Sequence, residues 1–215
     1  MTTTVERGQG GPRRPPEKYD GRRDELAESA LATLGRLGYA NTSLRDIAAA
    51  SEYSHGVLHY YFADKTELII HGVRLYKARC VHRYDDIVAD AATAEELRER
   101  FAAKLGETLL EEPTMHRLWY DLRNQSMFEA DFRGAVQMID ATLEEMIWRV
   151  VDRYAELSGR ACALSSPVAY AMLDGIFEKA VLEHVEDESA AAARLVERAF
   201  GVLPLMLGKP EDDVG

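Results

Sequence analysis

Residues 54–62 combine short polar side chains with aromatic rings at helical spacing. At 100° per residue the two kinds separate onto opposite sides, with Leu58, Tyr61 and Phe62 on one and His55, Gly56, His59 and Tyr60 on the other. The polar side offers hydrogen-bonding groups of short reach, and its glycine permits close approach of the backbone. Such a surface suits base edges and phosphates in the major groove of DNA.

Metal binding and catalysis are the other chemistries that these residue types suggest. His55 and His59 lie four residues apart on one helical side, but no third ligand is evident nearby, so we expect no metal and no cofactor. The chain has no G-x-S-x-G, P-loop or H-E-x-x-H string, and no His, Cys and Asp set with catalytic spacing. We therefore expect no enzyme; the alternative is a helical small-molecule-binding protein or enzyme without a role on DNA.

The elements around this segment predict a helix-turn-helix. Residues 43–50 form a short helix with Ser43 or Thr42 as N-cap and Asp46 three residues after Ser43. After a turn at 51–53, Ser54 caps the second short helix. A further helix begins at Asp64-Lys65, and its first turn offers the lysine and free backbone N–H groups to a phosphate.

This stretch resembles the DNA-binding domain of the TetR family of regulators, over about the first third of the chain. The resemblance rests on the helix-turn-helix, on the small-Gly-x-Leu-aromatic-Tyr-x-Phe pattern of 54–62, and on Lys65 and Leu68 after it. It implies a homodimer on double-stranded operator DNA, usually a repressor, which leaves the operator when a small-molecule effector binds. The expected DNA contacts are Thr42, Ser43, Arg45, Ser54, His55, Gly56, His59, Tyr60 and Lys65.

Two positions depart from the family's usual pattern. Glu52 stands in the turn where the family usually has glycine, so either the turn has another geometry or Glu52 bears left-handed strain of about 1 kcal/mol. His59 stands where the family favours a tyrosine that contacts phosphate, and an imidazole there would make DNA binding depend on pH.

Charge is unevenly distributed along the chain, whose net charge is -11. Residues 1–80 hold 12 basic and 10 acidic side chains, a net of +2, whereas the remainder holds 14 and 27, a net of -13. An acidic C-terminal part repels phosphate, so we expect DNA contact at the front only, with strong salt dependence. Two widely spaced cysteines, no signal peptide and no membrane-length apolar run predict a cytoplasmic bacterial protein without membrane contact.

The whole chain reads as all-α, because breaks at turn residues divide it into roughly eight to ten helices and no alternating strand pattern appears. We expect a mobile basic tail over 1–20, a three-helix DNA-binding domain over 21–68 and a helical effector-binding and dimerisation domain over 69–210. Order should begin near Arg22, and the first helix should stop at Gly38. In the tail, Arg13 and Arg14 either reach into a minor groove or are simply solvated.

The resemblance implies an effector pocket inside the C-terminal helices. Candidate lining residues, each also explained by ordinary packing or surface placement, are Phe101, His116, Trp119, Tyr120, Arg123, Met127, Trp148 and Tyr170. Two late helices, about 167–185 and 189–207, carry apolar stripes that either pack internally or form the four-helix dimer interface that the resemblance implies. The interface candidates are Ile176, Phe177, Ala180, Val181, His184, Leu195, Val196, Ala199, Phe200 and Leu203.

Overall fold

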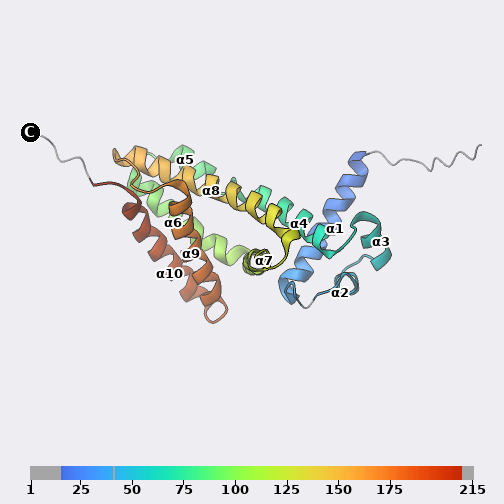
Figure 1. The fold of residues 1–215 in the computed structure, drawn as a ribbon. Coiled ribbons are helices and arrows are strands. Elements are labelled where there is room, and N and C mark those ends of the chain that lie inside the picture. The colour runs from blue at the N-terminus through green and yellow to red at the C-terminus, as the bar shows by residue number, and fades with distance from the viewer. Residues whose placement is uncertain (1–15, 41, 210–215) are drawn as a thin grey trace, which may run out of the picture.

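The computed structural model describes residues 16–40 and 42–209, and nearly all of them are helical (Figure 1). The described ranges contain no named strand, only an isolated bridge between Cys162 and Leu207. The all-α prediction is confirmed. The helices are α1 (Pro16–Leu37), α2 (Leu44–Ala49), α3 (His55–Tyr61), α4 (Lys65–Cys80), α5 (Asp85–Asp90), α6 (Ala94–Glu111), α7 (Pro113–Gln125), α8 (Ala130–Ser158), α9 (Ser166–His184) and α10 (Glu188–Val202), followed by a 3-10 turn, Leu203–Met206.

The first helix begins earlier than the sequence analysis predicts. It starts at Pro16, and not near Arg22, so the predicted tail over 1–20 was wrong for its last five residues. A proline fits the first turn of a helix, because the N–H that it lacks has no intrahelical partner there. The helix ends as predicted before Gly38, whose φ of 79° is left-handed. The predictions about Arg13 and Arg14 lie outside the described residues.

Helices α1 to α4 form the head, in which α1 packs along the first part of α4 (Figure 1). A Cβ added at Gly72 of α4 would lie 2.8 Å from Cγ of Leu31 and 3.1 Å from the carbonyl oxygen of Ala27. The two helices therefore meet at a distance that only glycine allows. Buried side chains from each helix complete the head's core, among them Leu34, Ile47, Leu58, Phe62 and Leu68.

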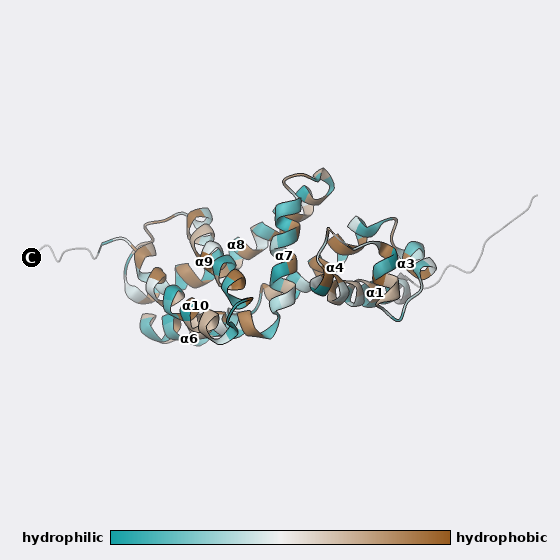
Figure 2. Cartoon of the chain, turned by 90° about the horizontal axis from the view of Figure 1, so that it is seen from below, coloured by the Kyte–Doolittle hydropathy of each residue, from teal (hydrophilic) through white to brown (hydrophobic). Residues whose placement is uncertain are grey.

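Helices α5 to α10 form the body, into which α4 also runs. Helix α10 packs against both α6 and α9, and the long α8 packs against α4, α6 and α9. In Figure 2 the helices carry both hydrophilic and hydrophobic residues, as amphipathic packing requires. No helix of the described ranges is long and apolar enough to cross a membrane.

The predicted dimer interface was wrong for most of its residues, because the stripes of α9 and α10 face the chain's own core. Six of the candidates are buried within the single chain: Ala180, Val181, His184, Leu195, Ala199 and Leu203. The other four are partly buried and packed against the core: Ile176, Phe177, Val196 and Phe200. The apolar side chains that these helices leave exposed are others, notably Val168 and Leu182 on α9.

Candidate functional site

The two short helices of the head are fixed at their N-termini by side-chain caps. The Ser43 side chain accepts a hydrogen bond from the Asp46 N–H, and Asp46 accepts the Ser43 N–H at 2.7 Å, which completes a capping box. The Ser43 hydroxyl also donates to the Asp46 carboxylate at 2.5 Å, and this bond, with that from the Ser43 N–H, holds the pKa of Asp46 below its usual range. Ser54 accepts the Val57 N–H at the start of α3. The N-cap of α2 is therefore Ser43 and not Thr42.

The polar side of α3 faces away from the head's core. Tyr60 is 65% exposed, and its ring stands edge-on to those of Tyr19 and Tyr61. The rings of His55 and His59 lie 4.4 Å apart, also edge-on. A Cβ added at Gly56 would meet nothing closer than the Ser54 hydroxyl oxygen at 4.0 Å. The fold itself thus does not require a glycine there, and the bare backbone is open to an approaching molecule.

The turn between α2 and α3 resolves the question raised by Glu52. Among the described residues no non-glycine has a positive φ, so Glu52 bears no left-handed strain and the turn has another geometry. Ser51 stabilises it: the Tyr53 N–H donates to the Ser51 hydroxyl oxygen at 3.3 Å. Arg45 is exposed in the first turn of α2.

Two of the expected DNA contacts, Thr42 and Lys65, bind carbonyl oxygens of the chain itself. Thr42 is buried, and its hydroxyl donates to the Gly38 carbonyl at 2.6 Å. The Lys65 ammonium donates to the Tyr39 carbonyl at 3.0 Å and lies 3.7 Å from the centre of the Tyr39 ring. Burial lowers the pKa of Lys65, and the carboxylates of Asp121 and Glu129 partly offset that effect. Both side chains therefore stabilise the end of α1 instead of facing outward.

Tyr39 joins the head to the body. Its backbone N–H donates to Asp121 of α7 at 2.9 Å, and its hydroxyl donates to Glu129, just before α8, at 2.7 Å. Its ring packs edge-on against Phe132 of α8 at 5.2 Å. Burial and the Glu129 hydrogen bond raise the pKa of Tyr39 to about 12. This cluster is the Tyr39 junction.

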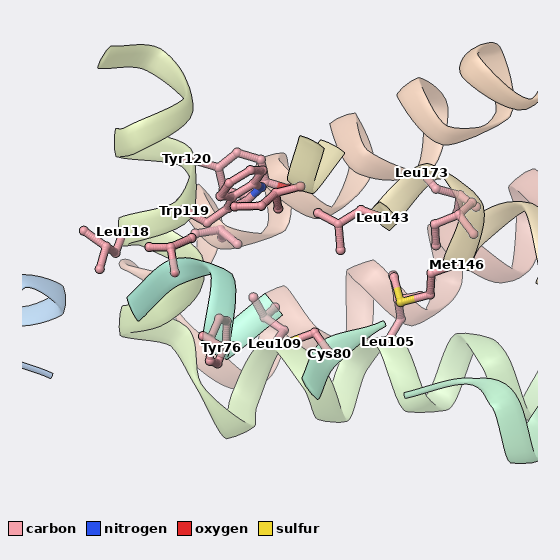
Figure 3. Packing of buried hydrophobic residues seen from close by; sticks show 14 of the residues in the cluster. Tyr76, Cys80, Leu105, Leu109, Leu118, Trp119, Tyr120, Leu143, Met146 and Leu173 are labelled. Atoms are coloured by element: carbon pink, nitrogen blue, oxygen red, sulfur yellow. The ribbon is translucent and has the colours of Figure 1, made fainter. Parts of the chain in front are cut away.

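The body contains a partly open cavity of about 70 Å³ between α4, α6, α7, α8 and α9. Figure 3 shows part of its wall: Cys80 of α4, Leu105 of α6, Trp119 and Tyr120 of α7, Leu143 and Met146 of α8 and Leu173 of α9. The polar and charged lining residues are Lys77, Arg83, Thr108, His116, Tyr120, Tyr170 and Asp174. A mostly apolar cavity with a few convergent polar groups is typical of a small-molecule site.

A charged cluster closes one side of the cavity. Arg123 forms ion pairs with Asp174 and, at 3.3 Å from its Nε, with Asp140. The Tyr170 hydroxyl donates to Asp140 at 2.8 Å, and the Tyr120 hydroxyl donates to Asp174 at 3.1 Å. Burial raises the pKa of both tyrosines, which keeps them protonated and able to donate. Both carboxylates are thus fully engaged by the protein.

His116 is a neutral member of the wall. Its Nε2 lies 2.8 Å from the Thr108 carbonyl oxygen, so this nitrogen carries the proton and donates. Burial, helped by the positive charge of Lys77, lowers the pKa of His116 to about 3. The imidazole adds no positive charge to the cavity near neutral pH.

Comparison with known proteins agrees with this arrangement of head and body. Residues 26–71, from α1 into α4, match the profile described as bacterial regulatory proteins of the tetR family. The head belongs to the TetR family. Its matched segment contains the capped α2, the turn and α3, which are the elements that present the exposed polar surface.

Relatives in the TetR family match far beyond the head. The HTH-type transcriptional regulator BetI of Paraburkholderia phymatum is 27% identical over 188 residues, which cover 85% of this chain and 92% of BetI. A regulator from Saccharomonospora viridis, solved with choline, has a TM-score of 0.71 at 14% identity and covers 89% of this chain and 100% of its own. FadR of Bacillus subtilis, solved with stearoyl-CoA, has a TM-score of 0.68 at 16% identity, over 83% and 96%. The structural likenesses concern the fold.

The structure brings half of the candidate pocket residues of the body to the cavity. His116, Trp119, Tyr120 and Tyr170 line it, and Arg123 lies behind it on Asp174. The prediction that Met127 lines the pocket was wrong, because its side chain is 64% exposed in the turn after α7. Phe101 packs against Tyr84 in the core, and Trp148 is a partly buried core contact; neither is among the lining residues. Phe177, predicted at the interface, lines the cavity instead.

Twelve of the sixteen lining residues were not predicted as pocket residues, and for two of them the sequence carries a signal. Lys77 follows Val73 and Tyr76 and precedes Cys80 on the buried stripe of α4, where a charged residue is out of place. Asp174 stands likewise on the stripe of Tyr170 and Leu173. In both cases, a charged residue at a core position of an amphipathic helix indicates the cavity.

Proposed function

We propose that this TetR-family chain is a ligand-responsive regulator of transcription that binds operator DNA through α3 and, as a repressor, is released when a small molecule fills the cavity. The observation that carries the proposal is that one chain combines a capped helix-turn-helix, with an open polar face, and a lined cavity in its helical body. The choline and stearoyl-CoA complexes of the two structural neighbours support a small-molecule ligand.

Helix α4 is the element through which the cavity can act on the head. Its first residue, Lys65, holds the Tyr39 junction, and its residues Lys77 and Cys80 line the cavity. Twelve residues of α-helix separate the two lysines by about 18 Å. A ligand that favours another tilt of α4 therefore changes the head's position, and a coupling free energy of about 1–3 kcal/mol suffices for regulation.

The function is tested by an operator shift assay with DNA from upstream of the chain's own gene or a neighbouring gene. We expect specific retardation that weakens steeply as salt rises, because phosphate contacts release counterions. A folded dimer that retards no such DNA specifically at low salt would overturn the regulator, and turnover of a bound ligand would favour the enzyme alternative.

The surface of α3 gives a sharper prediction. Gly56→Ala and Tyr60→Ala should each lower operator affinity about tenfold or more, since the first inserts a methyl between backbone and DNA and the second removes an exposed contact. Neither change should lower the melting temperature measurably, because Gly56 has open space around it and Tyr60 lies mostly outside the core.

The matched control is Gly134→Ala on α8, where an added Cβ also meets nothing within 4 Å. It makes the same chemical change in the body and should leave operator affinity unchanged. If Gly56→Ala and Tyr60→Ala both bind the operator with wild-type affinity, α3 does not contact the DNA. The remaining proposed contacts are Ser43, Arg45, Ser54, His55 and His59.

We propose further that two chains dimerise through the outward face of α9, with α10 beside it. Val168, Ala171, Gly175 and Leu182 fall on one side of α9, and all four are exposed. Leu182 is 69% exposed, and a Cβ at Gly175 would meet nothing within 4 Å. Lys179, also exposed, lies on this side between Gly175 and Leu182 and pairs with Glu183. The small and apolar residues around it let helices of two chains approach closely, and the two recognition helices need a dimer to reach successive turns of DNA.

Leu182→Glu should raise the dimer dissociation constant at least tenfold, because each chain loses about 1.5–3 kcal/mol of apolar burial and gains a carboxylate to desolvate. Sedimentation velocity over a concentration series measures it. Phe128→Glu is the control, since Phe128 is 81% exposed at the corner between α7 and α8. A Leu182→Glu chain that stays as dimeric as the control would refute this face.

We assign the regulator to the bacterial cytoplasm, where it would meet DNA. Its cysteines fit a reducing compartment: Cys80 and Cys162 are free, and Cys80 is buried in the cavity wall.

A further inference from the structure

The ammonium of Lys77 is a buried cation without an anion. The residue is only 6% exposed and lines the cavity. Its nearest described partners are aromatic: Nζ lies 4.7 Å from the centre of the Trp119 ring and 5.6 Å from that of Tyr76. Within residues 16–40 and 42–209 it makes no hydrogen bond or ion pair of its own. A buried charge in proteins is normally paired, so this one needs a partner that the described residues do not provide.

A second donor in the same wall is unsatisfied. Trp119 is buried, and its Nε1 has no hydrogen-bond partner among the described residues. An indole N–H can only donate, so what it lacks is an acceptor. The ring of Trp119 is also the one over which Lys77 lies, which brings the two unmet donors to one part of the cavity.

The cavity's acidic groups, by contrast, need nothing more. Asp174 and Asp140 are both paired with Arg123, and each accepts a tyrosine hydroxyl as well. Arg83 is neutralised by Glu112, 3.4 Å away. A cationic ligand would find no free carboxylate and would add its charge to that of Lys77. The groups of this wall that remain unpartnered among the described residues are the Lys77 ammonium, Trp119 Nε1 and the Thr108 hydroxyl. All three can donate, and together with the charge of Lys77 they call for an acceptor that carries negative charge.

The apolar part of the lining comes mainly from three helices. It includes Leu105 of α6, Leu143, Met146 and Ile147 of α8, and Leu173 of α9. Such a wall favours hydrocarbon over water. A ligand that satisfies the whole cavity is anionic at one end and apolar along the remainder.

We infer that the effector is an amphipathic monocarboxylate, whose carboxylate pairs with Lys77 and accepts from Trp119 Nε1 while its apolar body lies against α6, α8 and α9. The inference rests on the proposed function, because it names the chemical class of the ligand of that same cavity. Burial lowers the pKa of Lys77 to about 8, so the amine is mostly protonated at pH 7 and able to pair.

Calorimetric titration of the full-length protein, without DNA, tests the class. The probes are butanoate, octanoate and dodecanoate, with acetate as the anion that lacks an apolar body, octanamide as the neutral analogue and octyltrimethylammonium as the cationic one. At least one of the three longer carboxylates should bind, and acetate should not. Octanamide should bind at least tenfold more weakly than octanoate, and the cation more weakly still.

Lys77→Met should weaken binding of the best carboxylate at least tenfold and leave octanamide affinity within about twofold, which separates loss of charge from loss of the cavity. Trp119→Phe keeps an aromatic ring and removes only the N–H, and should weaken the carboxylate several-fold. Binding of octyltrimethylammonium in preference to octanoate would overturn the inference, as would no binding by any carboxylate or full carboxylate affinity in Lys77→Met.

Operator release is measured separately, so that the two proposals fail distinguishably. Carboxylate binding without release of DNA leaves the ligand class standing and refutes the repressor mechanism. If the protein binds DNA specifically but takes up no carboxylate, the regulator proposal stands and the ligand class is refuted.

Discussion

Lys77→Met is expected to raise the free energy of unfolding by about 3 kcal/mol at pH 7. Burial lowers the pKa of Lys77 from 10.5 to about 8 in the folded chain, and a difference of this size corresponds to about 3 kcal/mol of destabilisation by the charged form. Methionine fills a similar volume without a charge and keeps contact with the Trp119 ring. A variant that loses the effector would then be more stable than the wild type.

The same difference predicts a dependence on pH with a definite sign. Below pH 8 the amine is protonated in both states, and the folded state bears the full cost. Between about 8 and 10.5 the unfolded chain binds more protons, so wild-type stability gains relative to Lys77→Met as pH rises. Above 10.5 the cost is gone. The charged and titratable groups that act on this amine are Cys80, Arg83, His116, Asp140 and Asp174.

Urea unfolding of the wild type and Lys77→Met is measured at pH 7, 8.5 and 10, at one protein concentration. It gives the extra free energy of unfolding of the variant at pH 7 and the decrease of this difference as pH rises. Taking the difference between the two proteins removes the titration of groups that they share. Lys209→Met, at an exposed position, is the control and should change stability little. A Lys77→Met chain no more stable than wild type at pH 7 would mean that the ammonium has a partner in the apo protein.

Arg123→Met should have the opposite effect and lower the free energy of unfolding by about 2–3 kcal/mol. Asp174, with a side chain only 12% exposed, and Asp140 would lose their shared cation. Breaking a buried ion pair costs about 3–5 kcal/mol, and we reduce that figure because the Arg123 side chain is 31% exposed. The double variant Arg123→Met/Asp174→Asn should recover part of the loss.

The defect of Arg123→Met should shrink in acid. Burial already raises the pKa of Asp140 in the wild type, and without the guanidinium this folded-state pKa rises further. A group whose pKa is raised on folding contributes stability at low pH and loses it as pH rises through that value. The loss should therefore be smaller at pH 5 than at pH 8. Thermal melts at both values check this, with Arg117→Met at an exposed position of α7 as control.

Local patterns in the sequence predicted the elements well and their partners poorly. Ser54, Asp64 and Gly38 mark helix ends through bonds to residues close in the chain, and such ends can be predicted from types and spacing. Lys65 was placed correctly in the first turn of α4, but its acceptor, Tyr39, lies 26 residues earlier. No local pattern identifies a contact of that kind.

The dimer face was misjudged for a related physical reason. Periodicity shows that Leu195 and Ala199 lie on a buried side of their helix, but it does not show which surface buries them. In the structure that surface belongs to the same chain: α10 packs tightly on α6, where a Cβ at Gly106 would lie 2.6 Å from Cγ2 of Val196. The side that stays exposed, which we propose as the dimer face, is the less apolar one, and only the three-dimensional packing distinguishes the two.

The Tyr39 junction limits how this regulator can be re-engineered. Tyr39 sits at the end of the head, yet its hydrogen bonds go to Asp121 and Glu129 in the body, and Lys65 stacks on its ring. A chimera that grafted this head onto the sensor of another regulator would carry the tyrosine and the lysine but leave both carboxylates behind. A biosensor built from these parts therefore needs its exchange point placed so that the four residues travel together, or matching acids written into the recipient.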